Sequence, residues 1–180
     1  SNRSLDGGLV TGGTVRGRLD LRVGGSSQHS ERFLDPVHPD NLHNEGSAGS
    51  MSGQVGYRRG TADRVRLGLG IGRARYDVPN TEEQDAAGQD QRQRVALGFA
   101  DLAWQRVWSE RTVSQLSVYH RRSSTNLDGS DHDTPIFAFS DRSLVRTGGI
   151  AAVSHQRGRH LVKVGIEAQI EVYEIAKHYE

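Results

Sequence analysis

The stretch from His160 to Tyr173, HLVKVGIEAQIEVY, alternates strictly between apolar and polar residues. From Val162 to Val172 every even-numbered residue is apolar, and the residues between them are charged, amide-bearing or glycine. Successive side chains of a β-strand point to opposite faces, so the pattern predicts an extended strand with one apolar face and one polar face. About ten tilted residues cross a bilayer, and this stretch is long enough to do so.

The same alternation recurs near the N-terminus in TVRGRLDLRV, residues 14–23. Arg16, Arg18 and Arg22 fall on one face of the expected strand, and Leu19 and Leu21 fall on the other. A soluble sandwich would bury the apolar face in a core, whereas a transmembrane barrel would turn it to lipid and the arginines to a wet lumen. This segment alone fits both architectures.

The amino-acid composition excludes several classes of protein. The 180 residues carry a net charge of +1, so no strong overall field draws the protein to nucleic acid. There is no cysteine and therefore no disulfide framework. No apolar run approaches the length of a membrane helix, and no signal peptide precedes the first strand. The mean hydropathy of -0.65 suits a membrane barrel, in which half of each strand and the long loops are polar.

Alternation and turn residues together predict seven strands. They cover residues 13–23, 50–58, 64–75, 91–108, 112–123, 143–155 and 160–173. In the fourth of these strands the apolar residues change phase near Ala100 or Asp101, which predicts a β-bulge there. The tail EIAKHYE breaks the alternation and is expected to be an arbitrary or frayed end.

The connections between these strands alternate between long and short. The long ones are Gly24 to Gly49, Asp77 to Asp90 and Ser124 to Arg142. In an antiparallel meander all long loops then lie at one end, as in bacterial outer-membrane barrels. We therefore predict an all-β fold, in which residues 1–180 form a single segment of a transmembrane β-barrel, built as an antiparallel meander of about seven long strands. Because seven is odd and an open sheet edge is costly in lipid, further strands are expected to complete the barrel.

Four segments, in their order along the chain, carry a resemblance to a known family. They are RFLDPVHPDNLHNEG, DVPNTEEQDAAGQDQRQR, DTP followed by SDRSLVRTGG, and HQRGRHLVKVGIEAQ. Together they resemble the barrel of TonB-dependent outer-membrane receptors, especially the large carboxypeptidase-regulatory-like members, over residues 12–169. The resemblance implies a bacterial outer-membrane location, lipid around the barrel, a plug domain inside it and an energy-coupling TonB complex as partner. The sequence itself contains no plug domain, no energy-coupling box and no aromatic C-terminal strand.

Charged residues on the predicted polar faces are the candidate ligand-binding or lumen-lining residues. They are Arg16, Arg18, Arg22, Arg64, Arg66, Lys163, Glu167 and Glu171. Such side chains could contact a plug or an anionic ligand, or they could be solvated charges that pair with one another. Aromatic residues near the expected strand ends could form an interfacial belt or pack within the sheet. These aromatic residues are Tyr57, Trp104, Trp108 and Tyr119.

No catalytic, cofactor-binding or metal site is predicted. His29, His38 and His43 share the first long loop with Asp35 and Asp40, but their spacing matches no fixed ligand geometry. No nucleophile elbow or assembled base is present. The predicted function is uptake of a scarce ligand through a receptor barrel, in a protein that is not an enzyme. A soluble β-sandwich or small-barrel binding module is the alternative, and an outer-membrane barrel enzyme is a weaker one.

Overall fold

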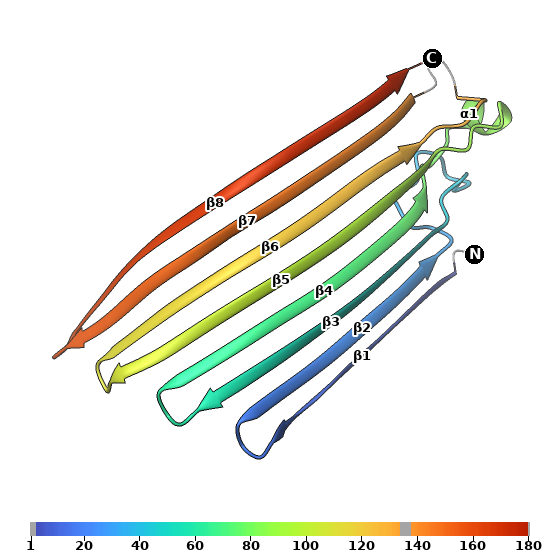
Figure 1. The fold of residues 1–180 in the computed structure, drawn as a ribbon. Coiled ribbons are helices and arrows are strands. Elements are labelled where there is room, and N and C mark those ends of the chain that lie inside the picture. The colour runs from blue at the N-terminus through green and yellow to red at the C-terminus, as the bar shows by residue number, and fades with distance from the viewer. Residues whose placement is uncertain (1–2, 134–137, 180) are drawn as a thin grey trace.

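The computed structural model describes residues 3–133 and 138–179, which form one antiparallel sheet (Figure 1). The eight strands pair strictly in chain order from β1 to β8. They are β1 (Ser4–Val15), β2 (Leu19–Ser30), β3 (Gly46–Arg59), β4 (Asp63–Asp77), β5 (Arg92–Ser109), β6 (Thr112–Asp128), β7 (Ala138–Arg157) and β8 (His160–Tyr179). A short helix, α1 (Glu82–Ala86), lies in the connection between β4 and β5. The predicted all-β meander is confirmed.

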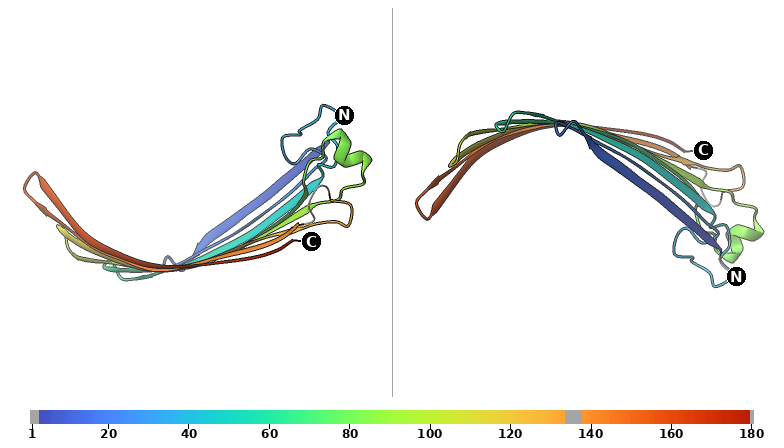
Figure 2. Two further views of the ribbon diagram at one scale, coloured as in Figure 1. Left: turned by 90° about the horizontal axis from the view of Figure 1, so that it is seen from above. Right: turned by 90° about the horizontal axis from the view of Figure 1, so that it is seen from below.

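The sheet is a single curved layer. Figure 2 shows that it is convex on the side that faces the viewer in Figure 1 and concave on the other. Among the described residues no hydrophobic side chain is buried. Leu69 and Val164 lie on the same convex face and are 51% and 68% exposed, so they do not meet in a dry interior. A sheet of this kind has no second layer to form the core of a sandwich.

Long and short connections are sorted to opposite ends of the sheet. Figure 1 shows the tight turns at 16–18, 60–62, 110–111 and 158–159 at one end. The connection 31–45, the connection 78–91 and the described part of the third, 129–133, lie at the other end. We call these ends the turn end and the loop end. Among the described residues, no helix is long and apolar enough to cross a membrane.

The eighth strand is β1, which the sequence pattern did not reveal. The strand expected at residues 13–23 is in fact the end of β1, a turn and the start of β2. Arg16 and Gly17 have positive φ angles of 49° and 64°, which reverse the chain. Since the turn has three residues, Val15 and Leu19 pair on the same face and the odd-even alternation continues across it unchanged.

Two other predictions were wrong. The register between β5 and β6 runs without a break past Ala100 and Asp101, and the irregularity lies between Val107 and Ser109 instead. The apolar residues change faces there because Leu97 and Phe99 contribute to the concave wall, with no extra residue inserted. Residues 174–179 of the tail EIAKHYE are not frayed, since β8 stays paired with β7 as far as Tyr179.

Most strands extend beyond their predicted ends toward the loops. β2 continues to Ser30 and β3 begins at Gly46, so the first long loop is 31–45 and not 24–49. β6 likewise continues to Asp128, and β7 begins at Ala138. The added parts of β2 and β3, residues 24–30 and 46–49, consist of glycine, alanine and polar residues, so they lack the alternation from which strands were predicted. Residues 134–137 of the third long segment lie outside the described part of the chain.

Candidate functional site: a two-faced barrel wall and its loops

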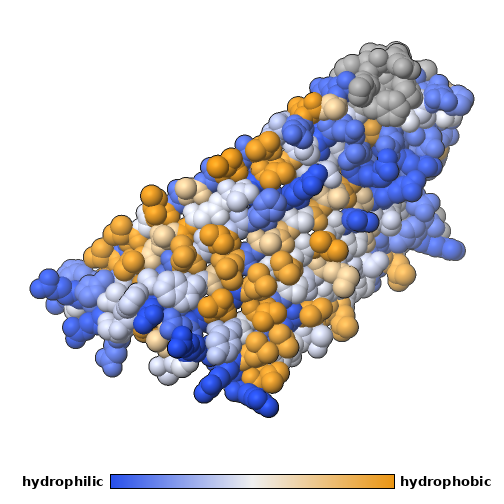
Figure 3. Space-filling view, viewed as in Figure 1, coloured by the Kyte–Doolittle hydropathy of each residue, from blue (hydrophilic) through white to orange (hydrophobic). Residues whose placement is uncertain are grey.

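The convex face carries a continuous band of aliphatic side chains. Figure 3 shows this band crossing the sheet, with hydrophilic surface beyond it toward the loops. The band includes Leu9, Leu21, Val23, Met51, Val55, Leu67, Leu69, Ile71, Leu102, Leu116, Val118, Val153, Val164, Ile166 and Ile170, all of them exposed. Register pairs such as Leu21 with Val55 and Leu67 with Leu102 join the strands into one band. Exposed aliphatic area on this scale marks a surface that contacts another protein or a membrane.

Aromatic residues border the band at the turn end. Tyr57 and Trp104 each pair with Val65 across the strands, on the convex face. Trp108 donates its indole N–H to Ser114 at 2.9 Å, and Arg106 lies 4.3 Å from the centre of its ring. In membrane proteins, aromatic rings at the border between apolar and polar surface form the belt at the membrane–water interface, and these rings have that position. Tyr119, the fourth aromatic residue considered from the sequence, lies on the concave face instead.

The concave face carries six of the eight charged residues predicted to line the lumen. They are Arg22, Arg64, Arg66, Lys163, Glu167 and Glu171, which the strand register places opposite the apolar band. Arg16 and Arg18 do not belong to this set, because both lie in the turn between β1 and β2. The prediction of a single arginine face was therefore wrong for these two residues.

At the turn end of the concave face, several charges surround a hollow of about 500 Å³. Asp20 accepts from Arg58 at 3.2 Å and from the Thr14 hydroxyl at 2.6 Å, and it lies 3.7 Å from Arg64. Arg22 lines the same hollow and has no carboxylate within ion-pair distance among the described residues. One carboxylate among three arginines leaves this hollow with positive charge.

A second hollow, of about 430 Å³, lies nearer the middle of the concave face, and the sequence did not predict it. It combines Leu97, Phe99 and Leu144 with the charged residues Arg121 and Arg146. Such a mixture of apolar surface and a few charges is typical of ligand-binding surfaces.

Ion pairs and glycines shape this second hollow. Arg146 contacts Glu171 at 2.6 Å, and Arg66 contacts Asp101 at 3.7 Å. Phe99 occupies the space next to Gly70, where an added Cβ would overlap its ring. Glycine here lets the aromatic ring lie against the wall, and the alternation of glycine in GLGIG was the sequence signal for it.

The connections at the loop end form an ordered cap, which buried polar side chains hold together. Asn44 is 3% exposed, accepts from the Leu34 N–H at 2.8 Å and donates to the Leu34 carbonyl at 2.7 Å. Asn80, 2% exposed, donates to the Gln89 carbonyl at 2.8 Å. These hydrogen bonds fix the loop backbone, because a buried amide or backbone group without a partner would lower the stability of the loop.

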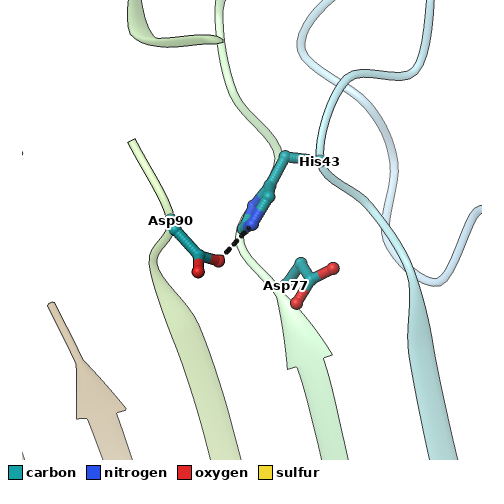
Figure 4. Close-up of side chains that lie close together, drawn as sticks. All are labelled: His43, Asp77 and Asp90. Carbon is teal, nitrogen blue, oxygen red and sulfur yellow. Dashed lines mark hydrogen bonds and ion pairs between the residues drawn. The ribbon is translucent and has the colours of Figure 1, made fainter. Parts of the chain in front are cut away.

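His43 joins the first loop to the second. Its Nδ1 lies 3.0 Å from the Val78 carbonyl oxygen. Its Nε2 lies 2.7 Å from Asp90 Oδ1, the contact drawn as a dashed line in Figure 4. Both nitrogens therefore face oxygens that accept, and the ring can donate to both of them only in its protonated, positively charged form. Burial alone would lower the pKa of His43, but the Val78 hydrogen bond and the charges of Asp90 and Asp77 raise it above its ordinary value.

His43, Asp77 and Asp90 are also the described residues best placed to hold a metal ion. Their ligand atoms lie within 4.8 Å of one another. However, Arg92 contacts Asp77 at 3.3 Å and Asp90 at 3.0 Å, so an Arg and a protonated His already balance the two carboxylates. The arrangement is that of an ion-pair network, and a metal would have to displace both the His43 proton and Arg92.

The junction between the loops should weaken as pH rises. A raised pKa means that the stabilising contribution of His43 is complete below the unfolded value of about 6.5 and is lost as pH passes through the folded value. Proteolysis within residues 31–45 should therefore be faster at pH 9 than at pH 6, after correction for the protease's own pH profile. The variant His43→Gln should show a much smaller difference. An equal difference in both proteins would contradict the assignment.

The fold of this chain matches that of known outer-membrane transporters. It superposes on the ferric citrate transporter FecA with a TM-score of 0.82 and 15% identity, covering 99% of this chain and 28% of FecA. The fold is that of a TonB-dependent receptor barrel segment. The copper transporter OprC matches with a TM-score of 0.72, 15% identity and coverage of 99% and 30%.

A third solved receptor, FpvA of P. aeruginosa in complex with a heterologous iron pyoverdine, matches with a TM-score of 0.67. The identity is 12%, over 98% of this chain and 27% of FpvA. The chain thus spans less than a third of each of these proteins. No protein-family model and no curated protein sequence matches it. The predicted resemblance to a receptor barrel is confirmed at the level of the fold.

Proposed function

We propose that this chain is part of the wall of a bacterial outer-membrane receptor that takes up a scarce ligand by a TonB-dependent mechanism. The observation that carries the proposal is the division of one curved sheet into an exposed aliphatic convex face and a charged concave face. In a closed barrel the first face contacts lipid and the second lines a watery passage. Both residue types are then in the medium that suits them.

The sheet edges support a larger barrel. Among the described residues, β1 and β8 each have one hydrogen-bonded neighbour. Lipid offers no partner for the free backbone groups of an edge strand, so we propose that further strands pair with both edges. In complete members of the family that the chain resembles, a plug domain closes the barrel, so the proposal includes a plug and the energy-coupling complex that would move it.

The loop cap and the lumen wall have distinct roles in this proposal. The cap formed by residues 31–45 and 78–91 is the first surface that an external ligand meets, and its buried hydrogen bonds make it preorganised. The positively charged hollow around Arg22, Arg58 and Arg64 lies beyond it, along the passage. The three solved proteins of the same fold are named for ferric citrate, copper and iron pyoverdine, so metal complexes are the first ligands to test.

Membrane fractionation of cells that express the intact protein tests the proposal. The protein should be recovered with the outer membrane, should need detergent for extraction, and should migrate faster on gels before boiling than after it. Cells should accumulate ⁵⁵Fe supplied as ferric citrate or ferric pyoverdine only while the inner membrane is energised. Recovery in the aqueous phase without detergent would instead support a soluble binding module and would exclude the receptor.

A further inference from the structure

The strongest unexplained feature of the convex face is a group of arginines directly beyond the aliphatic band. Arg73 and Arg75 follow Ile71 along β4 on the same face. Arg94 lies directly opposite Arg75 on β5, and Arg122 on β6 lies opposite Gly98. All four side chains are exposed. We call this group the rim arginines.

Few carboxylates neutralise the rim arginines. Arg94 pairs with Asp128 at 2.5 Å. Within the described part of the chain, no Asp or Glu lies within ion-pair distance of Arg73, Arg75 or Arg122. Like charges directly opposite each other on neighbouring strands destabilise a sheet, as Arg75 and Arg94 do here. An anion bound between them would remove that repulsion.

The surface beside these arginines is hollowed to a volume of about 540 Å³. On the convex face, most of the residues that line this hollow are small, namely Ser27, Ser47, Gly49, Ala96 and Ser124. Arg73, Arg75 and Arg94 line it as well. Each guanidinium can donate two parallel hydrogen bonds to a phosphate. The hollow therefore combines space with donors that match a phosphate group.

The location of the rim arginines indicates which phosphate-bearing molecule would bind. The rim arginines lie on the face that contacts lipid in the proposed barrel, at the loop end of the aliphatic band, where acyl chains give way to headgroups. Basic side chains at that level are attracted to anionic headgroups. We propose that the rim arginines bind phosphate groups of an outer-leaflet lipid, with the lipid's acyl chains lying along Ile71 and Leu69. This inference rests on the proposed membrane function.

Titration of the detergent-solubilised intact protein with lipid A, read by native mass spectrometry, tests the inference. The double variant Arg73→Gln/Arg75→Gln should bind lipid A roughly 25-fold more weakly than the unchanged protein, equivalent to about 2 kcal/mol for two headgroup arginines. The matched control is Arg59→Gln/Arg157→Gln, which removes two exposed arginines from the same face at the turn end and should bind normally.

The outcomes separate the two proposals. Lipid A stripped of its phosphates should bind the unchanged protein and the Arg73→Gln/Arg75→Gln variant equally weakly. If the rim variant keeps full affinity for intact lipid A, or if both variants lose it equally, the inference is overturned while the receptor proposal stands. If the unchanged protein fails to enter membranes, the receptor proposal fails first. Should the double variant misfold, Arg73→Gln alone, expected to weaken binding about fivefold, gives the same decision.

Discussion

The variant Ile166→Arg should fail to insert into a membrane. Ile166 is 72% exposed on the convex face of β8, and aliphatic residues flank it on both sides at Val164 and Ile170. Arginine on the lipid face of a barrel near the bilayer midplane costs about 2 to 4 kcal/mol. The fraction of protein that becomes heat-modifiable and protected from protease in vesicles should therefore fall at least tenfold.

Two further variants control this experiment. Leu69→Arg changes the same face on β4, a distant strand, and should have a similar effect. Gln169→Arg places the same charge on the concave face of β8, where water would solvate it, and should insert like the unchanged protein. If Ile166→Arg and Leu69→Arg insert as well as Gln169→Arg, the convex face does not contact lipid.

The variant Asn44→Ala should open the first loop without unfolding the sheet. It removes three side-chain hydrogen bonds, to the Leu34 N–H, the Leu34 carbonyl and Asn41, at a position that is 3% exposed. Leaving the backbone groups of Leu34 unpaired should cost about 3 kcal/mol of local stability. Amide hydrogen exchange within residues 31–45 should accelerate about a hundredfold, whereas exchange in β4 and β5 should stay unchanged.

Asn126→Ala is the matched control for the loop. Asn126 lies on β6, and its side chain has no hydrogen-bond partner in the described part of the chain. Its replacement should leave exchange in residues 31–45 as it is. Unchanged exchange in Asn44→Ala as well would mean that the loop is held by other contacts, for instance by Phe33, which stacks on Tyr76 at 5.1 Å.

The architecture could be predicted from residue order because each strand of a sheet with one apolar and one polar face must separate apolar from polar side chains. The pattern in residues 160–173 specifies both the strand and its two faces. The same pattern did not reveal β1, because apolar residues stay at odd-numbered positions on both sides of the turn at 16–18. The same logic also gave a false bulge near Ala100, because the concave face carries apolar residues such as Phe99 without any change of register.

The site could be predicted only in part. Alternation placed Arg22, Arg64 and Arg66 on the polar face. The carboxylates that pair with Arg64 and Arg66, Asp20 and Asp101, come from other strands, so these pairs depend on register. The rim arginines did leave a signal, since Arg73 and Arg75 occupy the phase that aliphatic residues occupy earlier in β4.

The loop contacts left no such signal. His43 and Asp90 are 47 positions apart, and only the folded loops bring them together. Polar loops have no periodicity from which such a contact could be inferred.

Single-cysteine scanning along β8 tests the central claim most directly, and residues 1–180 contribute no cysteine that would compete for the label. Spin labels would be placed one at a time at residues 162–171 of the intact protein in bilayers, and their collision rates with oxygen and with a water-soluble nickel chelate compared. The account predicts a period of two: Val164, Ile166 and Ile170 accessible to oxygen from lipid, and Lys163, Glu167 and Gln169 accessible to nickel from water. Uniform accessibility along the strand, or the opposite phase, would contradict it.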